Sequence, residues 1–178
     1  WGSNFRAGTS DLLVVEACEY RNHFLNFAPE VLVITNIELD HTDFFASLAD
    51  IESAFAEARA KANFAGLCRF GRVRLKDAEF AGLSLEGRFD LAYNAAHALC
   101  LAALRHHGYR STNRYIVFQL LPHTLGLGPE VWRVLAKCHD VRNLGEYEGD
   151  FNVDERLVAD LIAACRKVAE RLESLPPL

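Results

Sequence analysis

The chain has 178 residues, a formal net charge of −5 and a hydrophobic fraction of 51%. This length and apolar content suffice for one domain, or for one small domain with an appended segment. The acidic balance argues against the dominant basic surface that strong non-specific binding to nucleic acid requires, although it leaves room for a local basic patch.

The chain contains five cysteines without CxxC spacing: Cys18, Cys68, Cys100, Cys138 and Cys165. An odd number of unpaired positions predicts free thiols, so we expect a cytoplasmic protein. No apolar run approaches the roughly 18 residues that cross a bilayer, and no signal peptide is recognisable, so we expect no membrane partner. The absence of methionine leads us to expect a fragment, a processed product or a fusion.

Two short apolar runs near the start of the chain predict buried parallel strands: Asp11 to Val15 and Val31 to Ile37. The residues between them are sufficient for a crossover helix, so we expect a strand–helix–strand unit. Polar side chains follow both runs, at the carboxyl ends where open α/β sheets bind ligands: Glu16, Asn36, Asp40 and His41.

Residues 1–58 resemble the central domain of Mur ligases, through the blocks VVEACEYRNHFLNF and PEVLVITNIELDHTDFF. The resemblance implies binding of ATP and Mg²⁺, with Glu16 and His41 as magnesium-associated residues and Asn36 and Asp40 shaping the same pocket. Cations there would offset the phosphate charge during ATP-driven amide formation. The phosphate-loop pattern GxxxxGK[ST] does not occur in the sequence. One hypothesis is therefore a fragment of an ATP-dependent ligase of peptidoglycan synthesis that is inactive alone.

The remainder of the chain predicts amphipathic helices with short connections, which is typical of an antiparallel bundle. We expect them from a capping box at Ser47 to about Phe64, over about Arg72 to Phe80, from Ser84 to Gly108, from Thr112 or Asn113 to Pro122, from Pro129, and from about Asn152 to Pro176. The predicted fold class is mainly α, a helical bundle preceded by a truncated α/β segment. The predicted domains are 1–58 and 59–178, with the boundary within 56–66.

Residues from about Asn63 to Leu175 resemble the HEPN superfamily of small helical domains. The resemblance rests on RFDLAYNAAHALCLAALRHHGYR and VWRVLAKCHDVRNLGEYEGDF, in which Asn143 follows Arg142 and Tyr147 comes five residues after the arginine. It implies a toxin–antitoxin or nucleotide- and RNA-associated module that needs no cofactor. It also implies a homodimer that pairs across the arginine-bearing helix, and a nucleotidyltransferase antitoxin that modifies Tyr147.

Whether this bundle is an enzyme stays open on the sequence. Cleavage of RNA through its 2′-hydroxyl needs a cation and a proton acceptor. Arg142 offers the cation, but Tyr147 occupies the position where many HEPN members carry histidine, and a phenol with an ordinary pKa of about 10 is a poor base at pH 7. His139, three residues before Arg142 on the same helical face, is the alternative base.

Structural roles are the alternatives for the same side chains. Arg142 has nearby carboxylates in Asp140, Glu146 and Glu148 that could pair with it to stabilise the fold. His97 falls on the apolar face of its helix, where we expect a hydrogen-bonded core histidine. His106 and His107 favour a helix C-terminus. A second interpretation combines these two with Arg105, Arg110 and Arg114 as an anion-binding patch.

Overall fold

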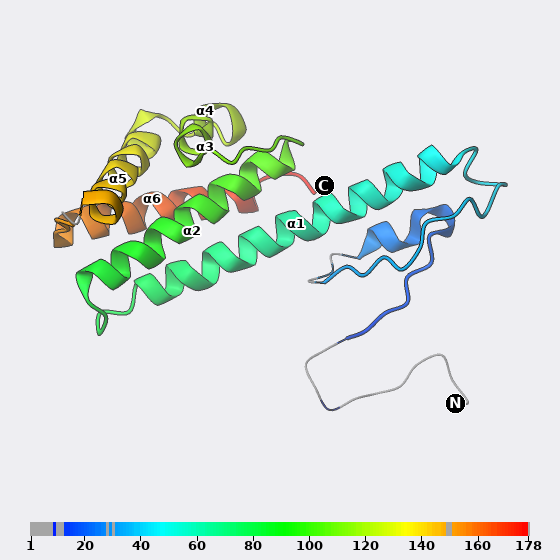
Figure 1. The fold of residues 1–178 in the computed structure, drawn as a ribbon, viewed down its shortest axis with the longest axis horizontal. Coiled ribbons are helices and arrows are strands. Elements are labelled where there is room, and N and C mark those ends of the chain that lie inside the picture. The colour runs from blue at the N-terminus through cyan, green and yellow to red at the C-terminus, as the bar shows by residue number, and fades with distance from the viewer. Residues whose placement is uncertain (1–8, 10–12, 28, 30, 149–150, 178) are drawn as a thin grey trace.

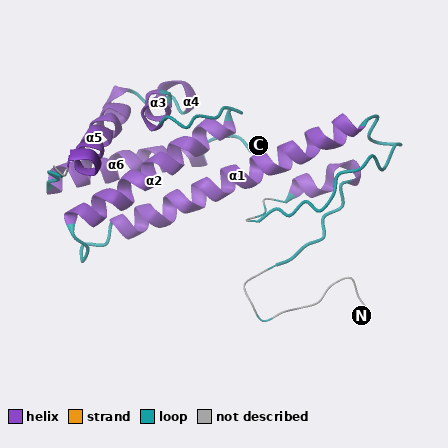
Figure 2. Ribbon diagram, in the orientation of Figure 1, coloured by secondary structure: helices purple, strands orange, loops and turns teal. Residues whose placement is uncertain are grey.

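A computed structural model describes residues 9, 13–27, 29, 31–148 and 151–177 of the chain. Within these residues the regular structure is entirely helical, which confirms the mainly α fold class (Figures 1 and 2). The elements are a 3-10 segment η1 (Tyr20–Asn26) and the helices α1 (Leu48–Ala78), α2 (Leu85–His106), α3 (Arg114–Gln119), α4 (Leu121–Thr124), α5 (Pro129–Glu148) and α6 (Glu155–Glu173).

The two predicted strands do not form over the described residues. Residues 13–15 and 31–37 are irregular, whereas Asp11 and Leu12 lie outside the described residues. Val14 is 92% exposed and Val33 is 76% exposed. A strand needs hydrogen-bond partners for its backbone groups and a neighbouring element that covers its apolar face. Two short runs alone supply neither. The predicted strand–helix–strand unit is therefore wrong over these residues, and only η1 lies between the two runs.

The predicted helices over Ser47 to Phe64 and Arg72 to Phe80 form one continuous helix, α1. Its start is as expected, since Ser47 and Asp50 form a capping box. Two glycines lie in the middle of α1, and one of them, Gly71, packs tightly against α2. A Cβ atom at Gly71 would lie 2.6 Å from the Cγ atom of Leu99. This glycine lets the two helices approach closely, and tertiary packing outweighs its low helix propensity.

Helix α2 is the centre of the bundle, with contacts to all the other α-helices. Ser84 caps its first turn through a hydrogen bond from the Gly87 amide, and Gly108 follows its end with φ of +78°. Both features agree with the sequence analysis. The α2 side chains Phe89, Tyr93 and Leu99 are fully buried in the bundle core.

The remaining helices begin close to their predicted positions. Asn113 caps α3, Pro122 lies in the first turn of α4 after α3 has ended at Gln119, and α5 begins at Pro129. Helix α6 begins slightly later than predicted, because Asp154 rather than Asn152 accepts the capping hydrogen bond. Its predicted inner face is buried as expected: Leu157, Leu161, Ala164, Cys165, Val168 and Leu172.

Two separate apolar cores lie along α1. The first, which we call the N-terminal core, consists of Phe24, Phe45, Ile51, Ala54 and Ala58. The second is the bundle core, which the C-terminal half of α1 joins through Phe64, Leu67, Cys68 and Leu75. Along α1, the last residue of the N-terminal core is Ala58 and the first residue that packs on the bundle core is Phe64, so the boundary lies inside a continuous helix. The division into domains at residue 58 stays a prediction.

All five cysteines are free, and only Cys18 is exposed. Burial raises the pKa of the Cys138 thiol to about 12. Among the described residues, the helices lack the length and apolar character needed to cross a membrane.

Candidate functional site

The four predicted ligase-site residues lie in the irregular segments that pack beside α1. Glu16, Asn36 and Asp40 are exposed. The side-chain amide of Asn36 donates a hydrogen bond to the Glu38 carboxylate at 2.5 Å. The backbone amide of His41 donates one to the Asp40 carboxylate at 2.6 Å. These contacts are local within one loop. The structure therefore brings Asp40 and His41 together, and among the described residues no contact joins Glu16 to them.

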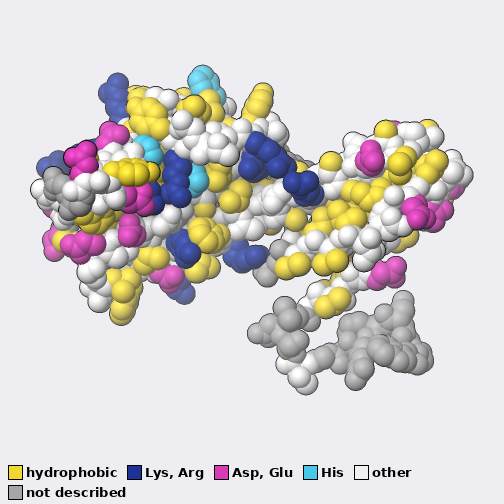
Figure 3. Space-filling model, in the orientation of Figure 1, with side chains coloured by type: hydrophobic (Ala, Val, Ile, Leu, Met, Phe, Trp, Pro, Cys, Tyr) yellow, Lys and Arg dark blue, Asp and Glu magenta, His cyan; other side chains and the backbone are white. Residues whose placement is uncertain are grey.

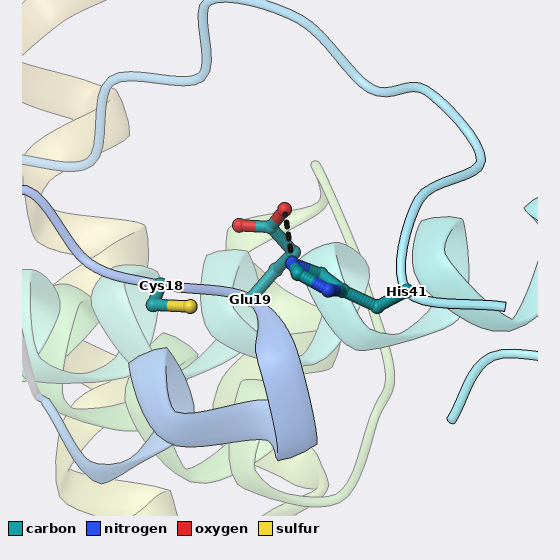
Figure 4. Close-up of side chains that lie close together, drawn as sticks. All are labelled: Cys18, Glu19 and His41. Atoms are coloured by element: carbon teal, nitrogen blue, oxygen red, sulfur yellow. Dashed lines mark ion pairs between the residues drawn. The ribbon is translucent and has the colours of Figure 1, made fainter. Parts of the chain in front are cut away.

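His41 instead lies beside Cys18 and Glu19 (Figure 4). Its Nε2 atom is 3.5 Å from Glu19 Oε1, and the potential ligand atoms of all three residues lie within 4.8 Å of one another. The ring of Tyr20 packs against the imidazole of His41 with 4.7 Å between the ring centroids. Tyr20 also donates its hydroxyl hydrogen bond to Asp43 at 2.8 Å, which raises the pKa of Tyr20.

This arrangement fits Mg²⁺ and ATP poorly. Magnesium prefers oxygen ligands, usually carboxylates, phosphates and waters. The group around His41 offers a thiol and an imidazole with one carboxylate, and Glu16 is not part of it. The assignment of Glu16 and His41 to magnesium stays a prediction that this geometry does not favour.

The bundle contains a second set of polar side chains, which joins α2 to α5. The buried Tyr93 hydroxyl lies 2.7 Å from Nδ1 of His139. The side-chain amide of Asn143 lies 3.2 Å from Nε2 of the same imidazole. Both ring nitrogens of His139 are thus engaged, so His139 accepts a proton from a substrate only after one of these contacts opens. Burial and the nearby Arg142 and Arg114 lower the pKa of His139, although Asp140 acts in the opposite direction.

Two guanidinium groups approach Tyr93 in this group. The Cζ atom of Arg142 lies 5.1 Å from the ring centroid of Tyr93, and that of Arg114 lies 5.6 Å from it. Such distances permit cation–π attraction. Arg142 donates to Glu146 with two nitrogens, one of them at 2.7 Å. Of the three carboxylates considered from the sequence, Glu146 is the one that pairs with Arg142.

His97 completes the group from α2. Its pKa falls to about 4, first because of burial and then because of the positive charges of Arg114 and Arg142 and the neighbouring His139. His97 Nε2 and Arg114 Nη1 are buried atoms without a hydrogen-bond partner among the described residues. The expectation of a hydrogen-bonded core histidine is therefore wrong at Nε2. We call these residues the basic cluster: Tyr93, His97, Arg114, His139, Arg142 and Asn143.

Tyr147 does not join the basic cluster in any contact that the structure gives, and it is 82% exposed. Tyr93 is not recognisable from the sequence as a member of a polar site, and the spacing of the basic residues puts Arg114 in a different patch. Helical spacing assigns Tyr93 to an apolar stripe, and the pairing of α2 with α5 cannot be deduced from spacing. A tyrosine and a histidine within one apolar face were the signals available.

The other predicted basic patch is dispersed by local contacts. The Nε2 atoms of His106 and His107 lie 2.8 Å from the carbonyl oxygens of Pro176 and Thr124. Arg105 donates to the carbonyl oxygen of Tyr109, while Arg114 lies in the basic cluster. Figure 3 shows histidine and basic side chains near the middle of the bundle face, and acidic side chains at its left end.

Comparison with known proteins gives matches over part of the chain. The UDP-N-acetylmuramate–L-alanine ligase of Desulfitobacterium hafniense is 52% identical over 60 residues, which cover 34% of this chain and 13% of the ligase. Enzymes of the same name from Caldicellulosiruptor saccharolyticus and Borreliella burgdorferi are 48% and 47% identical over 60 and 51 residues, or 34% and 29% of this chain and 13% and 11% of those enzymes.

No family model matches the chain, and no solved structure matches it. The matched stretches span only 11% to 13% of the length of these three ligases. About a third of this chain is thus similar to UDP-N-acetylmuramate–L-alanine ligases.

Proposed function

We propose that the chain combines a ligase-derived segment, which forms no amide bond by itself, with a HEPN-like bundle that binds RNA or nucleotide phosphates. The single observation that carries the second part is the basic cluster. Two guanidinium groups converge on one buried tyrosine, and two buried nitrogens there lack a hydrogen-bond partner among the described residues. Groups of this kind bind phosphate oxygens through charge-assisted hydrogen bonds.

The chemistry of the cluster favours binding over cleavage. His97 and His139 have lowered pKa values, so both imidazoles are neutral at pH 7. Neutral imidazoles beside two arginines can donate to a phosphate oxygen, but the nitrogens of His139 are already held by Tyr93 and Asn143. His139 is therefore not free to accept a proton, and His97, whose pKa falls to about 4, is a weak base at pH 7. Arg142 needs to exchange Glu146 for a phosphate.

The test is binding of a fluorescent single-stranded RNA at two salt concentrations, by the purified chain and by its variant Arg142→Ala. We expect salt-dependent binding that Arg142→Ala weakens at least tenfold, and no cleavage of the RNA. Arg133→Ala is the matched control, because it removes the same charge from an exposed position of the same helix. Equal weakening by both variants, or no binding by the unaltered chain, contradicts the proposal.

The same proposal extends to partners of the bundle. Leu144 and Tyr147 are exposed on α5, the helix that carries Arg142. An exposed apolar side chain near the site supports a homodimer across α5, and an exposed phenol supports modification by a nucleotidyltransferase antitoxin. Light scattering at high concentration tests the dimer, which a strict monomer contradicts. Mass spectrometry after co-expression with a candidate antitoxin tests the modification, with Tyr147→Phe as the control.

The second candidate function concerns the ligase-like part, and its support is the identity to the ligases. We assign the matched 60 residues to the segment 1–58 and its neighbours, where the resembling blocks lie. Retained pieces of a Mg²⁺ and ATP site then explain the sequence, but the segment lacks strands over its described residues. The test is phosphate release from ATP in the presence of UDP-N-acetylmuramate and L-alanine. We expect none above background, and substrate-dependent release contradicts the proposal.

A further inference from the structure

Two anchored segments bring Cys18, Glu19 and His41 together (Figure 4). The carbonyl oxygens of Cys18 and Glu19 accept hydrogen bonds from the Phe24 and Asn22 amides at 3.1 and 2.9 Å. Phe24 is 5% exposed and belongs to the N-terminal core. Cys18 and Glu19 are therefore tied to the start of η1, whose buried residue fixes the segment against α1.

The histidine is anchored to the same core from the other side. The carbonyl oxygen of His41 accepts hydrogen bonds from the amides of Phe44 and Phe45, at 2.8 and 2.9 Å. Phe45 is 3% exposed within the N-terminal core. The Tyr20 ring packs against the imidazole and restricts its rotation. Both halves of the group are thus held by one small core, although they come from segments about 20 residues apart.

The donor set determines which ion this group suits. A thiolate, an imidazole and a carboxylate are ligands of zinc, with bonds of about 2.0 to 2.3 Å in a tetrahedral site. Ligand atoms at such bond lengths lie about 3.3 to 3.8 Å from one another by tetrahedral geometry. The distance of 3.5 Å between His41 Nε2 and Glu19 Oε1 already falls in this range. All the potential ligand atoms of the three residues lie within 4.8 Å of one another, so they need to move closer by at most about 1 Å to bind the ion. Magnesium disfavours a thiol and requires more oxygen ligands.

We propose that Cys18, Glu19 and His41 bind a Zn²⁺ ion, with a water molecule as the fourth ligand. Binding releases the thiol proton to solvent, and the ion takes the place of the contact between His41 and Glu19. This site differs from the magnesium site that the ligase resemblance implies, because Glu16 is replaced by Cys18 and Glu19. It is independent of the basic cluster and of the proposed RNA binding.

The test uses Co²⁺ as a spectroscopic substitute for zinc, added to the purified full chain under reducing conditions. We expect one equivalent of Co²⁺ to produce a thiolate charge-transfer band in the near ultraviolet and the intense visible bands of tetrahedral cobalt. The four other cysteines are buried, so a thiolate band reports Cys18. Zn²⁺ should abolish both bands stoichiometrically, whereas a large excess of Mg²⁺ should leave them unchanged.

The variants identify the ligands. Cys18→Ser should lose the charge-transfer band, and His41→Ala should weaken Co²⁺ binding at least tenfold. Glu19→Gln should weaken it while the thiolate band remains, and Glu16→Gln is the matched control that should leave the spectrum unchanged. Far-ultraviolet circular dichroism establishes that each variant keeps the helical content of the chain. A spectrum without a thiolate band, a band that persists in Cys18→Ser, or an equal loss in Glu16→Gln overturns the proposal.

Discussion

The hydroxyl of Tyr93 lies 2.7 Å from Nδ1 of His139 and links the centre of α2 to α5. The two residues are 46 positions apart in the sequence, and their rings are stacked with 6.2 Å between centroids. Tyr93 is completely buried, so its hydroxyl depends on this contact and on the adjacent Arg114. The packing of the bundle therefore sets the orientation of His139, and the basic cluster contributes to the contact between α2 and α5.

Replacing Tyr93 by phenylalanine tests this link. Tyr93→Phe keeps the ring but leaves Nδ1 of His139 without its partner, so we expect a loss of about 1 to 2 kcal/mol in the free energy of unfolding. Urea denaturation followed by circular dichroism measures it. Tyr109→Phe is the control, because Tyr109 is 65% exposed, and it should change stability by less than about 0.5 kcal/mol. Equal stability of both variants would show that the hydrogen bond contributes nothing.

The lowered pKa of His97 predicts a pH dependence of stability. The unfolded chain binds a proton at His97 near pH 6.5, whereas the folded chain does so near pH 4. Falling pH therefore favours the unfolded state, and stability from this group is lost as pH decreases from about 6.5 to 4. Burial disfavours the charged imidazole most strongly, and the charges of Arg114, Arg142 and His139 add to this effect.

The measurement compares urea unfolding at pH 7 and pH 5 for the unaltered chain and His97→Gln. The unaltered chain should lose about 1 to 2 kcal/mol more than the variant over this range, after allowance for the partial exposure of the imidazole. Other titrating groups cancel in the difference. His123→Gln, at an exposed position of the bundle, should retain the full pH dependence. An unchanged pH dependence in His97→Gln would mean that the imidazole titrates normally.

Two glycines of α1 offer a matched pair of substitutions. Gly71→Ala places a methyl group 2.6 Å from Leu99 Cγ and 3.3 Å from the Ala95 carbonyl oxygen. We expect this overpacking to cost about 1 to 3 kcal/mol, more than the gain in helix propensity. Gly66→Ala meets no atom within 4 Å and should stabilise the helix by up to about 1 kcal/mol. Melting temperatures of the two variants should shift in opposite directions, and a shift of the same sign would contradict the close approach of α1 and α2.

The elements that sequence predicted well are those specified by local signals. Ser47, Ser84 and Asn113 cap helices because their side chains reach amides three residues away, which a sequence pattern can encode. The apolar stripe of α6 likewise follows from its period alone. The role of Gly71 depends on Leu99 in another helix, so a local pattern does not reveal it. Locally, glycine only lowers the helix propensity of α1. The close approach of α2 is possible because Gly71 has no side chain.

The candidate sites show the same difference between residues placed by local sequence and residues placed by helix packing. Arg142, Asn143 and His139 are on one helix, so spacing placed them together correctly. Tyr93, His97 and Arg114 join them only through helix packing. In the N-terminal segment, the predicted grouping of Glu16 with His41 assumed that two strands pair side by side. Without that pairing, the turn of η1 determines which acidic residue reaches the imidazole, and Glu19 is the one that does.

Polar substitutions in the apolar runs distinguish the observed segment from a folded sheet. Val33 is 76% exposed, so Val33→Lys should change the free energy of unfolding by less than about 0.5 kcal/mol. Ile51 is 1% exposed in the N-terminal core, so Ile51→Ala should cost about 2 to 4 kcal/mol for the lost contacts and the cavity. Urea unfolding of both variants provides the comparison. If Val33 were in a buried strand, its lysine variant would carry an unpaired charge into a core and lose more stability than Ile51→Ala.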